Sequence, residues 1–263
     1  MTENRTDIGA KARVAIVTGG ESGIGRACAI ALGQTGHSVT LTYFRDSTAA
    51  DAVVRDIDAA GGRAIAVQAD VGQEDAVERL FDAAEGAFGT VTRLVNSAGL
   101  NMSGTMIGAM SLAQFDRVIR SDLYGPFLTC RRFVRGLGET GTGRIVNISS
   151  IHERAPRPGG VDYDSAKGGL AQLTATLALE LAPRRIAVNG VAPGMILTPM
   201  NQSAIDDKAE LARKEAAIPW RRAGTAADVA TLVQFLLSDA ADYITGTTVT
   251  IDGALSLTVA QNA

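Results

Sequence analysis

The feature that most constrains this fold is a short apolar run that leads directly into a glycine-rich turn. The run Val14–Val17 is largely β-branched, which favours a strand buried on both faces. Gly19, Gly23 and Gly25 follow it, and a helical pattern then runs over Arg26–Leu32. Glycines at a strand-to-helix turn leave backbone N–H groups open at the helix N-terminus, where a pyrophosphate binds. In this context the turn predicts a dinucleotide site, whereas the glycines alone would indicate only a tight turn.

Beyond this turn, strand-like apolar runs alternate with helical patterns. The expected strands are Val14–Thr18, Val39–Tyr43, Ala64–Gln68, Arg93–Asn96, Arg144–Ile148, Ile186–Val191 and Thr247–Ile251. The expected helices include Ala49–Ala59, Glu74–Phe88, Leu112–Leu137 and Ala166–Leu181. Such alternation is typical of a parallel sheet with helices on both faces. We therefore expect one α/β domain over residues 13–263, a Rossmann-like doubly wound parallel sheet of about seven strands, after a polar tail over residues 1–12.

A tyrosine and a lysine, Tyr163 and Lys167, stand four positions apart. On a helix this spacing places both side chains on one face. A free phenol is a poor acid or base at neutral pH, but a fixed lysine charge nearby favours the phenolate. Ser150, with Ser149 as the neighbouring alternative, supplies a hydroxyl for the same substrate oxygen. The group predicts proton transfer at a carbonyl or alcohol oxygen, although Tyr163 and Lys167 alone would also fit a solvated helix face.

Several motifs together resemble those of the short-chain dehydrogenase/reductases. They are Thr18–Gly25, Asn96–Gly99, Ser150, Tyr163–Lys167 and Pro193–Gly194, in that family's order and spacing. The resemblance implies an enzyme that moves a hydride between a nicotinamide and a secondary alcohol or carbonyl. It makes Tyr163 the acid in reduction and the base in oxidation. Ser150 would orient the substrate oxygen, and Lys167 would also hold the nicotinamide ribose.

The same resemblance implies the residues that contact the cofactor. They are Gly19, Glu21, Ser22, Gly23, Ile24 and Gly25 in the turn, Thr42 and Arg45 at the second strand, Asp70 and Val71 after the third, Asn96, Ala98 and Gly99 after the fourth, and Tyr163, Lys167, Pro193, Gly194, Ile196 and Thr198. Ser97 stands where a second asparagine is usual in the family.

The end of the second strand bears on the form of the cofactor. NAD-specific sites place a carboxylate there, which holds the ribose hydroxyls and repels a 2′-phosphate. In register with the family this position is Tyr43, which is neutral, and Arg45 lies close enough in sequence to reach a phosphate. We therefore expect NADP(H) to be favoured over NAD(H). Asp46 leaves the alternative open, because its carboxylate would instead hold the ribose.

One candidate catalytic position departs from the family pattern. Many members carry an asparagine in the helix corresponding to Phe115–Gly125, where it helps to hold a water joined to the catalytic lysine. This chain has Asp122 there. The aspartate would keep the backbone part of that role and raise the pKa of Lys167 through its charge. The alternative is a helix residue with no catalytic part.

Composition bears on partners and location. A formal net charge of −3 gives no basic footprint for nucleic acid and no polybasic membrane patch, and we see no apolar run long enough for a membrane span. With two histidines, no metal cluster is expected. Cys28 and Cys130 fit small buried hydrophobes. We expect a cytoplasmic protein that binds a small alcohol or carbonyl substrate, and the family implies a homotetramer.

The segments Ser149–Glu153 and Val191–Asn201 resemble the sugar and polyol branch of the family, notably the bacterial glucose 1-dehydrogenases. This resemblance implies that His152 meets substrate hydroxyls, although a surface loop is the alternative. Residues 199–223 correspond to the family's mobile lid over the substrate, where Trp220 would form an apolar wall. A sugar, polyol or related alcohol is the expected substrate.

Two other functions stay open. The first is a 3-oxoacyl-[acyl-carrier-protein] reductase, for which Arg131, Arg132 and Arg135 are candidates for a carrier-binding basic patch. The second is a non-catalytic dinucleotide-sensing protein. A pure binder has no need for Ser150 and Tyr163 at this spacing, which argues against the second.

Overall fold

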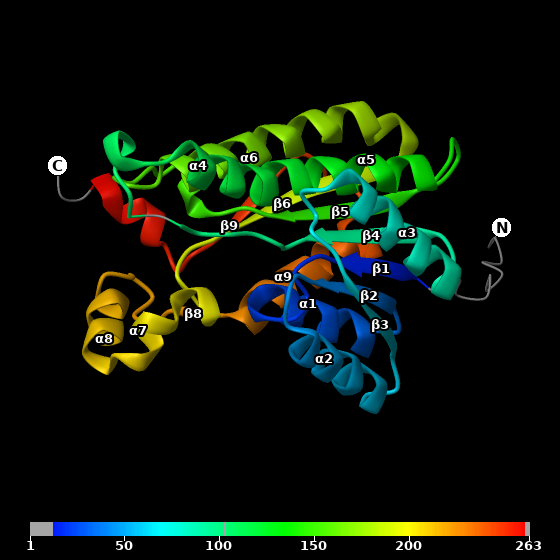
Figure 1. Cartoon of the computed structure of the whole chain (residues 1–263), viewed down its shortest axis with the longest axis horizontal. Helices are drawn as coiled ribbons and strands as arrows, with labels where there is room; N and C mark the ends of the chain where they lie inside the picture. The colour runs from blue at the N-terminus through cyan, green and yellow to red at the C-terminus, as the bar shows by residue number, and fades with distance from the viewer. Residues whose placement is uncertain (1–12, 103, 261–263) are drawn as a thin grey trace, which may run out of the picture.

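A seven-stranded parallel sheet forms the centre of the structure, a computed structural model that describes residues 13–102 and 104–260 (Figure 1). Its strand order is β3–β2–β1–β4–β5–β6–β9. The strands are β1 Val14–Val17, β2 Ser38–Tyr43, β3 Arg63–Gln68, β4 Val91–Asn96, β5 Gly143–Ile148, β6 Ile186–Pro193 and β9 Thr248–Ile251. The predicted fold class is confirmed, and the expected tail over residues 1–12 lies outside the described residues.

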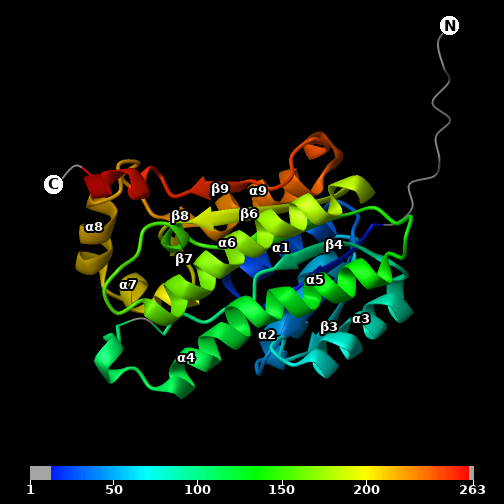
Figure 2. The same ribbon diagram turned by 90° about the horizontal axis from the view of Figure 1, so that it is seen from above.

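Helices cover both faces of this sheet (Figures 1 and 2). The α-helices of the described residues are α1 Gly23–Gln34, α2 Ser47–Ala59, α3 Glu74–Phe88, α4 Leu112–Ile119, α5 Gly125–Gly136, α6 Val161–Leu181, α7 Gln202–Asp206, α8 Lys208–Ala216 and α9 Ala226–Leu237. Helices α1, α2 and α9 pack on one face, and α3, α5 and α6 pack on the other. None of the described helices is long and apolar enough to cross a membrane.

The alternation of side chains along β1 shows why both faces need a cover. Val14 and Ile16 join the core formed with α3, α5 and α6. Ala15 and Val17 join the core formed with α1, α2 and α9. Successive residues of a strand point to opposite faces, so a strand that is apolar throughout is stable only between two layers. The predicted buried cysteines, Cys28 and Cys130, lie one in each core.

The strand order reverses beside β1, which lies between β2 and β4. In open α/β sheets, ligands bind in the crevice at the carboxyl ends of the strands where this reversal occurs. Thr18 reinforces the junction, since its Oγ1 accepts hydrogen bonds from the N–H groups of Ser97 and Ala98, both at 3.0 Å. The topology therefore directs the glycine-rich turn and the loop after β4 toward one crevice.

The expected single helix over Leu112–Leu137 is wrong in detail. The segment forms α4 and α5, joined by a π-helical turn over Arg120–Tyr124. Such turns insert an extra residue and are frequent at functional sites. The turn includes Asp122, whose side chain is fully buried.

The segment 199–223, expected to act as a lid, contains α7 and α8. It is flanked by a two-stranded sheet of β7 Ile196–Leu197 and β8 Gly224–Thr225. The sequence pattern did not predict the helices in this segment, and it did not predict α9. The mobility of this segment stays a prediction.

Candidate active site

The glycine-rich turn after β1 holds its backbone against the loop after β4. A Cβ at Gly19 would lie 2.8 Å from the Cα of Ala98, and Gly19 has a φ of +63°. A Cβ at Gly25 would lie 2.0 Å from the carbonyl oxygen of Gly19. The N–H of Gly19 donates to Oγ1 of Thr42 at 3.0 Å. Because only glycine fits here, the start of α1 stays open to a ligand, and this cradle fits the pyrophosphate of a dinucleotide.

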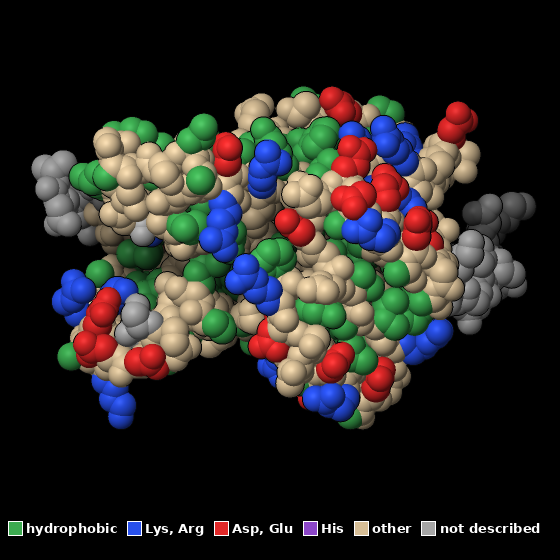
Figure 3. Space-filling view, in the orientation of Figure 1, with side chains coloured by type: hydrophobic (Ala, Val, Ile, Leu, Met, Phe, Trp, Pro, Cys, Tyr) green, Lys and Arg blue, Asp and Glu red, His purple; other side chains and the backbone are tan. Residues whose placement is uncertain are grey.

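A cavity of about 760 Å³ extends from this turn along the carboxyl ends of the strands. Figure 3 shows this face of the molecule hollowed between the part that carries α4 and α6 and the part that carries α7 and α8. The predicted residues that line the cavity are Gly19, Glu21, Ser22, Gly23, Ile24, Gly25, Thr42, Arg45, Asp70, Val71, Ala98, Gly99, Asp122, Ser150, Tyr163, Lys167, Pro193, Gly194, Ile196 and Thr198. The cavity therefore connects the glycine-rich turn with the candidate catalytic residues Ser150, Tyr163 and Lys167.

The candidate catalytic side chains come from two elements. Tyr163 and Lys167 lie one turn apart near the start of α6, and Ser150 follows β5. Lys167 Nζ lies 5.4 Å from the centre of the Tyr163 ring and donates to the Ile148 carbonyl oxygen at 3.1 Å. All three candidate catalytic residues are at least nine-tenths buried. The structure therefore brings a phenol, an ammonium and a hydroxyl to one wall of the cavity.

Asp122 and Lys167 form a buried ion pair, with 3.1 Å between Oδ2 and Nζ. The other oxygen of Asp122 accepts the N–H of Leu100 at 2.7 Å. Burial raises the pKa of Asp122, and the charge of Lys167 opposes this rise. Burial also lowers the pKa of Lys167, but the charges of Asp122 and Tyr163 outweigh it and the pKa is raised. The aspartate therefore keeps the lysine in its charged form.

Two predicted site residues do not line the cavity. Asn96 is buried, where its amide donates to Asn147 at 2.9 Å and its oxygen accepts from Thr129 at 2.7 Å. It therefore ties β4 to β5 and α5. His152 bonds to the carbonyl oxygen of Ala155 through Nδ1 at 2.8 Å, and its ring meets Tyr163 edge-on at 6.3 Å between centres.

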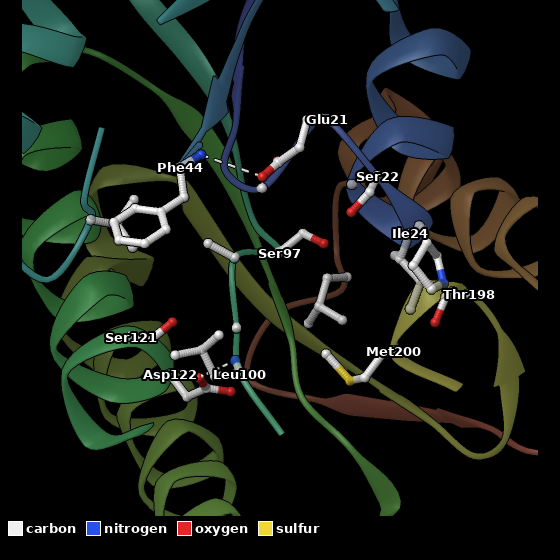
Figure 4. Close-up of a pocket in the computed structure, with 18 of the residues that line it drawn as sticks. Glu21, Ser22, Ile24, Phe44, Ser97, Leu100, Ser121, Asp122, Thr198 and Met200 are labelled. Atoms are coloured by element: carbon white, nitrogen blue, oxygen red, sulfur yellow. Dashed lines mark hydrogen bonds between the residues drawn. The ribbon is translucent and has the colours of Figure 1, made fainter. Parts of the chain in front are cut away.

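Other lining residues were not predicted as site residues, although Asp46 and Ser149 were considered as alternatives, Ser97 was noted as a departure from the family pattern, and residues 199–201 belong to the expected lid. They are Phe44, Asp46, Ala49, Ala69, Ser97, Leu100, Ala113, Asp116, Arg117, Arg120, Ser121, Ile148, Ser149, Pro199, Met200 and Asn201. Figure 4 shows Leu100, Ser121 and Met200 among the side chains around the cavity. Several come from α4 and its π-helical turn, which approach the crevice only through tertiary packing. Trp220, expected as an apolar wall, is largely exposed and is not among the lining residues.

The arginines considered for a carrier-binding patch are mostly engaged by α3. Arg132 pairs with Glu78 and Glu85, both at 2.8 Å. Arg131 pairs with Glu74. These carboxylates offset the positive charge, so this surface offers less attraction to an acidic carrier protein.

Comparison with known proteins places these features in a family. Residues 19–256 match the family model described as enoyl-(acyl carrier protein) reductase. The chain is also 42% identical over 248 residues to 3beta-hydroxysteroid dehydrogenase 1 of Eggerthella lenta, which covers 94% of this chain and 95% of that relative. The chain belongs to the short-chain dehydrogenase/reductases. As a member of this family it is an oxidoreductase that acts on CH–OH groups with an NAD(P) cofactor.

Other relatives carry different names for their substrates. Glucose 1-dehydrogenase 2 of Bacillus subtilis is 37% identical over 252 residues, 95% of this chain and 96% of that protein. The 3-oxoacyl-[acyl-carrier-protein] reductase of Synechocystis is 42% identical over 245 residues, 93% of this chain and 97% of that protein. The short-chain dehydrogenase/reductase assignment therefore fixes the reaction class and leaves the substrate open, and it disfavours the dinucleotide-sensing alternative.

Proposed function

We propose that this short-chain dehydrogenase/reductase oxidises a secondary alcohol of a sugar or polyol, as its glucose 1-dehydrogenase relative is named to do. When bound, the nicotinamide supplies the hydride acceptor. The observation that carries the proposal is the position of the Lys167 ammonium, 5.4 Å from the Tyr163 ring centre, in a cavity that Ser150 also lines. This arrangement supports proton transfer at a substrate oxygen next to the glycine-rich cradle.

Each of these side chains has one task in the proposed reaction. In oxidation the phenolate oxygen of Tyr163 takes the proton of the substrate alcohol. In the reverse reaction the Tyr163 hydroxyl returns this proton to the carbonyl oxygen. The positive charge of Lys167, 5.4 Å from the Tyr163 ring centre, attracts the negative charge that the phenol oxygen carries during the transfer. Ser150 Oγ donates to the substrate oxygen and so stabilises the charge that develops there. Asp122 contributes by keeping Lys167 charged.

The sugar assignment draws support from the segment Ser149–Glu153 and from the Bacillus subtilis relative. Within this segment Ser149 donates to Glu153 at 2.7 Å, and His152 contacts the Tyr163 ring rather than the cavity. We therefore propose that His152 packs against Tyr163 and does not make the predicted contact with substrate hydroxyls.

A 3-oxoacyl thioester reductase is the second candidate, and the identity to the Synechocystis relative favours it. The ion pairs of Arg131 and Arg132 with α3 argue against it, because they offset the charge that a carrier protein would meet. The same side chains of the site would serve either reaction, so substrate assays must separate the two.

The test compares initial rates of the purified protein with D-glucose plus NAD⁺ or NADP⁺, and with a 3-oxoacyl thioester plus NADH or NADPH. The proposal predicts clear cofactor reduction with the sugar and a lower kcat/KM with the thioester. Rapid thioester reduction by protein that is inactive on sugars and polyols would favour the second candidate instead.

Two narrower expectations remain proposals, and a third, the cofactor preference, is replaced below. The homotetramer implied by the family stays a prediction. Light scattering tests it by measuring the molecular mass in solution. The cytoplasmic location also stays a prediction, and cell fractionation tests it. The expected preference for NADP(H) depended on Arg45 and on a neutral Tyr43. Glu21 gives a physical reason for the opposite preference, which is developed below.

A further inference from the structure

Glu21, in the middle of the glycine-rich turn, has one carboxylate oxygen engaged and one without a partner. Its Oε1 accepts the N–H of Phe44 at 3.3 Å, a bond drawn as the dashed line in Figure 4. Its Oε2 is shielded from water and has no hydrogen-bond partner among the described residues. The residue lines the cavity that the turn cradles. A buried carboxylate oxygen without a donor is unfavourable, so this position is suited to a ligand that donates a hydrogen bond.

The position of this carboxylate matters because Phe44 is the first residue after β2. In dinucleotide-binding sheets a carboxylate at the end of this strand accepts a hydrogen bond from the adenosine ribose. The strand itself supplies no carboxylate, because it ends at Tyr43. Glu21 brings the missing group to the same place from the neighbouring turn.

The other charged groups near this strand end are less suited to the role. Asp46 Oδ1 already accepts the N–H of Ala49 at 2.9 Å as the N-cap of α2. The guanidinium of Arg45 lies over the exposed ring of Phe44, 5.1 Å from its centre. The turn contributes no cation of its own, since Ser22 follows Glu21 before Gly23. Arg117 and Arg120 also line the cavity, but they come from α4 and the π-helical turn rather than from the strand end.

We propose that Glu21 selects the cofactor: its free carboxylate oxygen accepts a hydrogen bond from an adenosine ribose hydroxyl and makes the enzyme prefer NAD(H) to NADP(H). A ribose hydroxyl can donate to Oε2, whereas a 2′-phosphate offers acceptor oxygens and negative charge. This inference replaces the expectation of NADP(H) drawn from Arg45. It depends on the family's dinucleotide cofactor and not on the proposed sugar substrate.

The test measures the dissociation constants of NADH and NADPH by calorimetry for the wild-type protein and for Glu21→Gln. Glutamine keeps the size of the side chain, removes its charge and adds a donor that a phosphate accepts. The wild-type protein should bind NADH roughly 10- to 100-fold more tightly than NADPH, the range expected for a hydrogen bond to a charged group. Glu21→Gln should weaken NADH binding, strengthen NADPH binding and bring the ratio of the two constants to about one or below.

Asp46→Asn is the matched control, because it removes the other carboxylate at this strand end while asparagine still caps α2 well. The ratio of its NADPH and NADH dissociation constants should stay near that of the wild-type protein. Circular dichroism of both variants checks that they fold. The proposal is overturned if the wild-type protein prefers NADPH or binds both cofactors equally. It is also overturned if Glu21→Gln leaves the ratio unchanged or Asp46→Asn changes it as much. Since only binding is measured, a wrong sugar assignment would not alter these outcomes.

Discussion

At the scale of single residues, the ion pair of Asp122 and Lys167 distinguishes this active site from the family pattern. Both side chains are almost fully buried, so removing one partner leaves an uncompensated charge in a poorly solvated place. The family's usual asparagine carries no charge, so in its place the lysine would have no carboxylate partner at this position. The aspartate here instead holds the lysine protonated, and the site depends on that charge.

This pair predicts a dependence of stability on pH. The folded pKa of Lys167 is raised, so the stability from its charge is fully present below its ordinary pKa and is lost as pH rises through the folded pKa. Asp122→Asn removes the main source of that rise. The variant should lose about 3 kcal/mol of unfolding free energy at neutral pH. The difference from the wild-type protein should shrink as pH rises above about 10.4, the ordinary lysine pKa, because only the wild-type protein then loses the stability that the ion pair contributes. Urea unfolding between about pH 7 and pH 11.5 measures both effects, and superimposable curves for the two proteins would contradict them.

The sequence predicted that the candidate catalytic residues Tyr163 and Lys167 lie together, but it did not predict the orientation of Glu21. Tyr163 and Lys167 lie one helical turn apart, so their proximity follows from local geometry alone. Glu21 was expected among the cofactor contacts, but its bond to Phe44 joins positions 23 apart in sequence. That contact exists only once β2 has packed beside β1, so the neutral Tyr43 led to the opposite cofactor preference.

At the scale of elements, the glycine-rich turn is the tightest point of the cofactor cradle. Gly25, in the first turn of α1, packs directly against the carbonyl of Gly19. Gly86, in contrast, is an exposed residue inside α3 around which a Cβ would meet open space. A side chain is therefore excluded at Gly25 but tolerated at Gly86, so the same substitution at the two positions can be compared.

Gly25→Ala should destabilise the protein by about 1–3 kcal/mol, because a methyl group must displace the Gly19 backbone. The same displacement should weaken NADH binding, since it moves the N–H groups at the start of α1. Gly86→Ala should stabilise the protein by about 0.5–1 kcal/mol and leave binding unchanged, because alanine favours the helix. Denaturant unfolding and cofactor titration of both variants check this, and equal effects at both positions would contradict it.

Regular elements were easier to predict than their interruptions. Helix α3 was predicted with its observed bounds, since its apolar residues follow one clear helical face. The segment Leu112–Leu137 was expected to be one helix because its periodicity continues through the π-helical turn at Arg120–Tyr124. The turn holds Asp122 against Lys167 of α6, a tertiary contact that no local pattern reveals.

At the scale of the whole molecule, the cavity is assembled from the loops after β1, β2, β3, β4, β5 and β6. The alternation of strands and helices predicted this arrangement, because parallel strands bring their carboxyl ends to one edge of the sheet. It did not predict that α4 and residues 199–201 close the remaining sides. These walls lie outside the motifs that identify the reaction class, which is why the sequence predicted the reaction class better than the substrate.

The central claim is that Tyr163 carries the proton in a hydride-transfer reaction at this cavity. The most direct measurement is kcat/KM for D-glucose oxidation by the wild-type protein and by Tyr163→Phe, with cofactor binding measured on the same samples. We expect kcat/KM to fall by about 100-fold or more, while the variant still binds the cofactor and unfolds at a similar denaturant concentration. A variant that turns over the substrate at nearly the wild-type rate would contradict the mechanism.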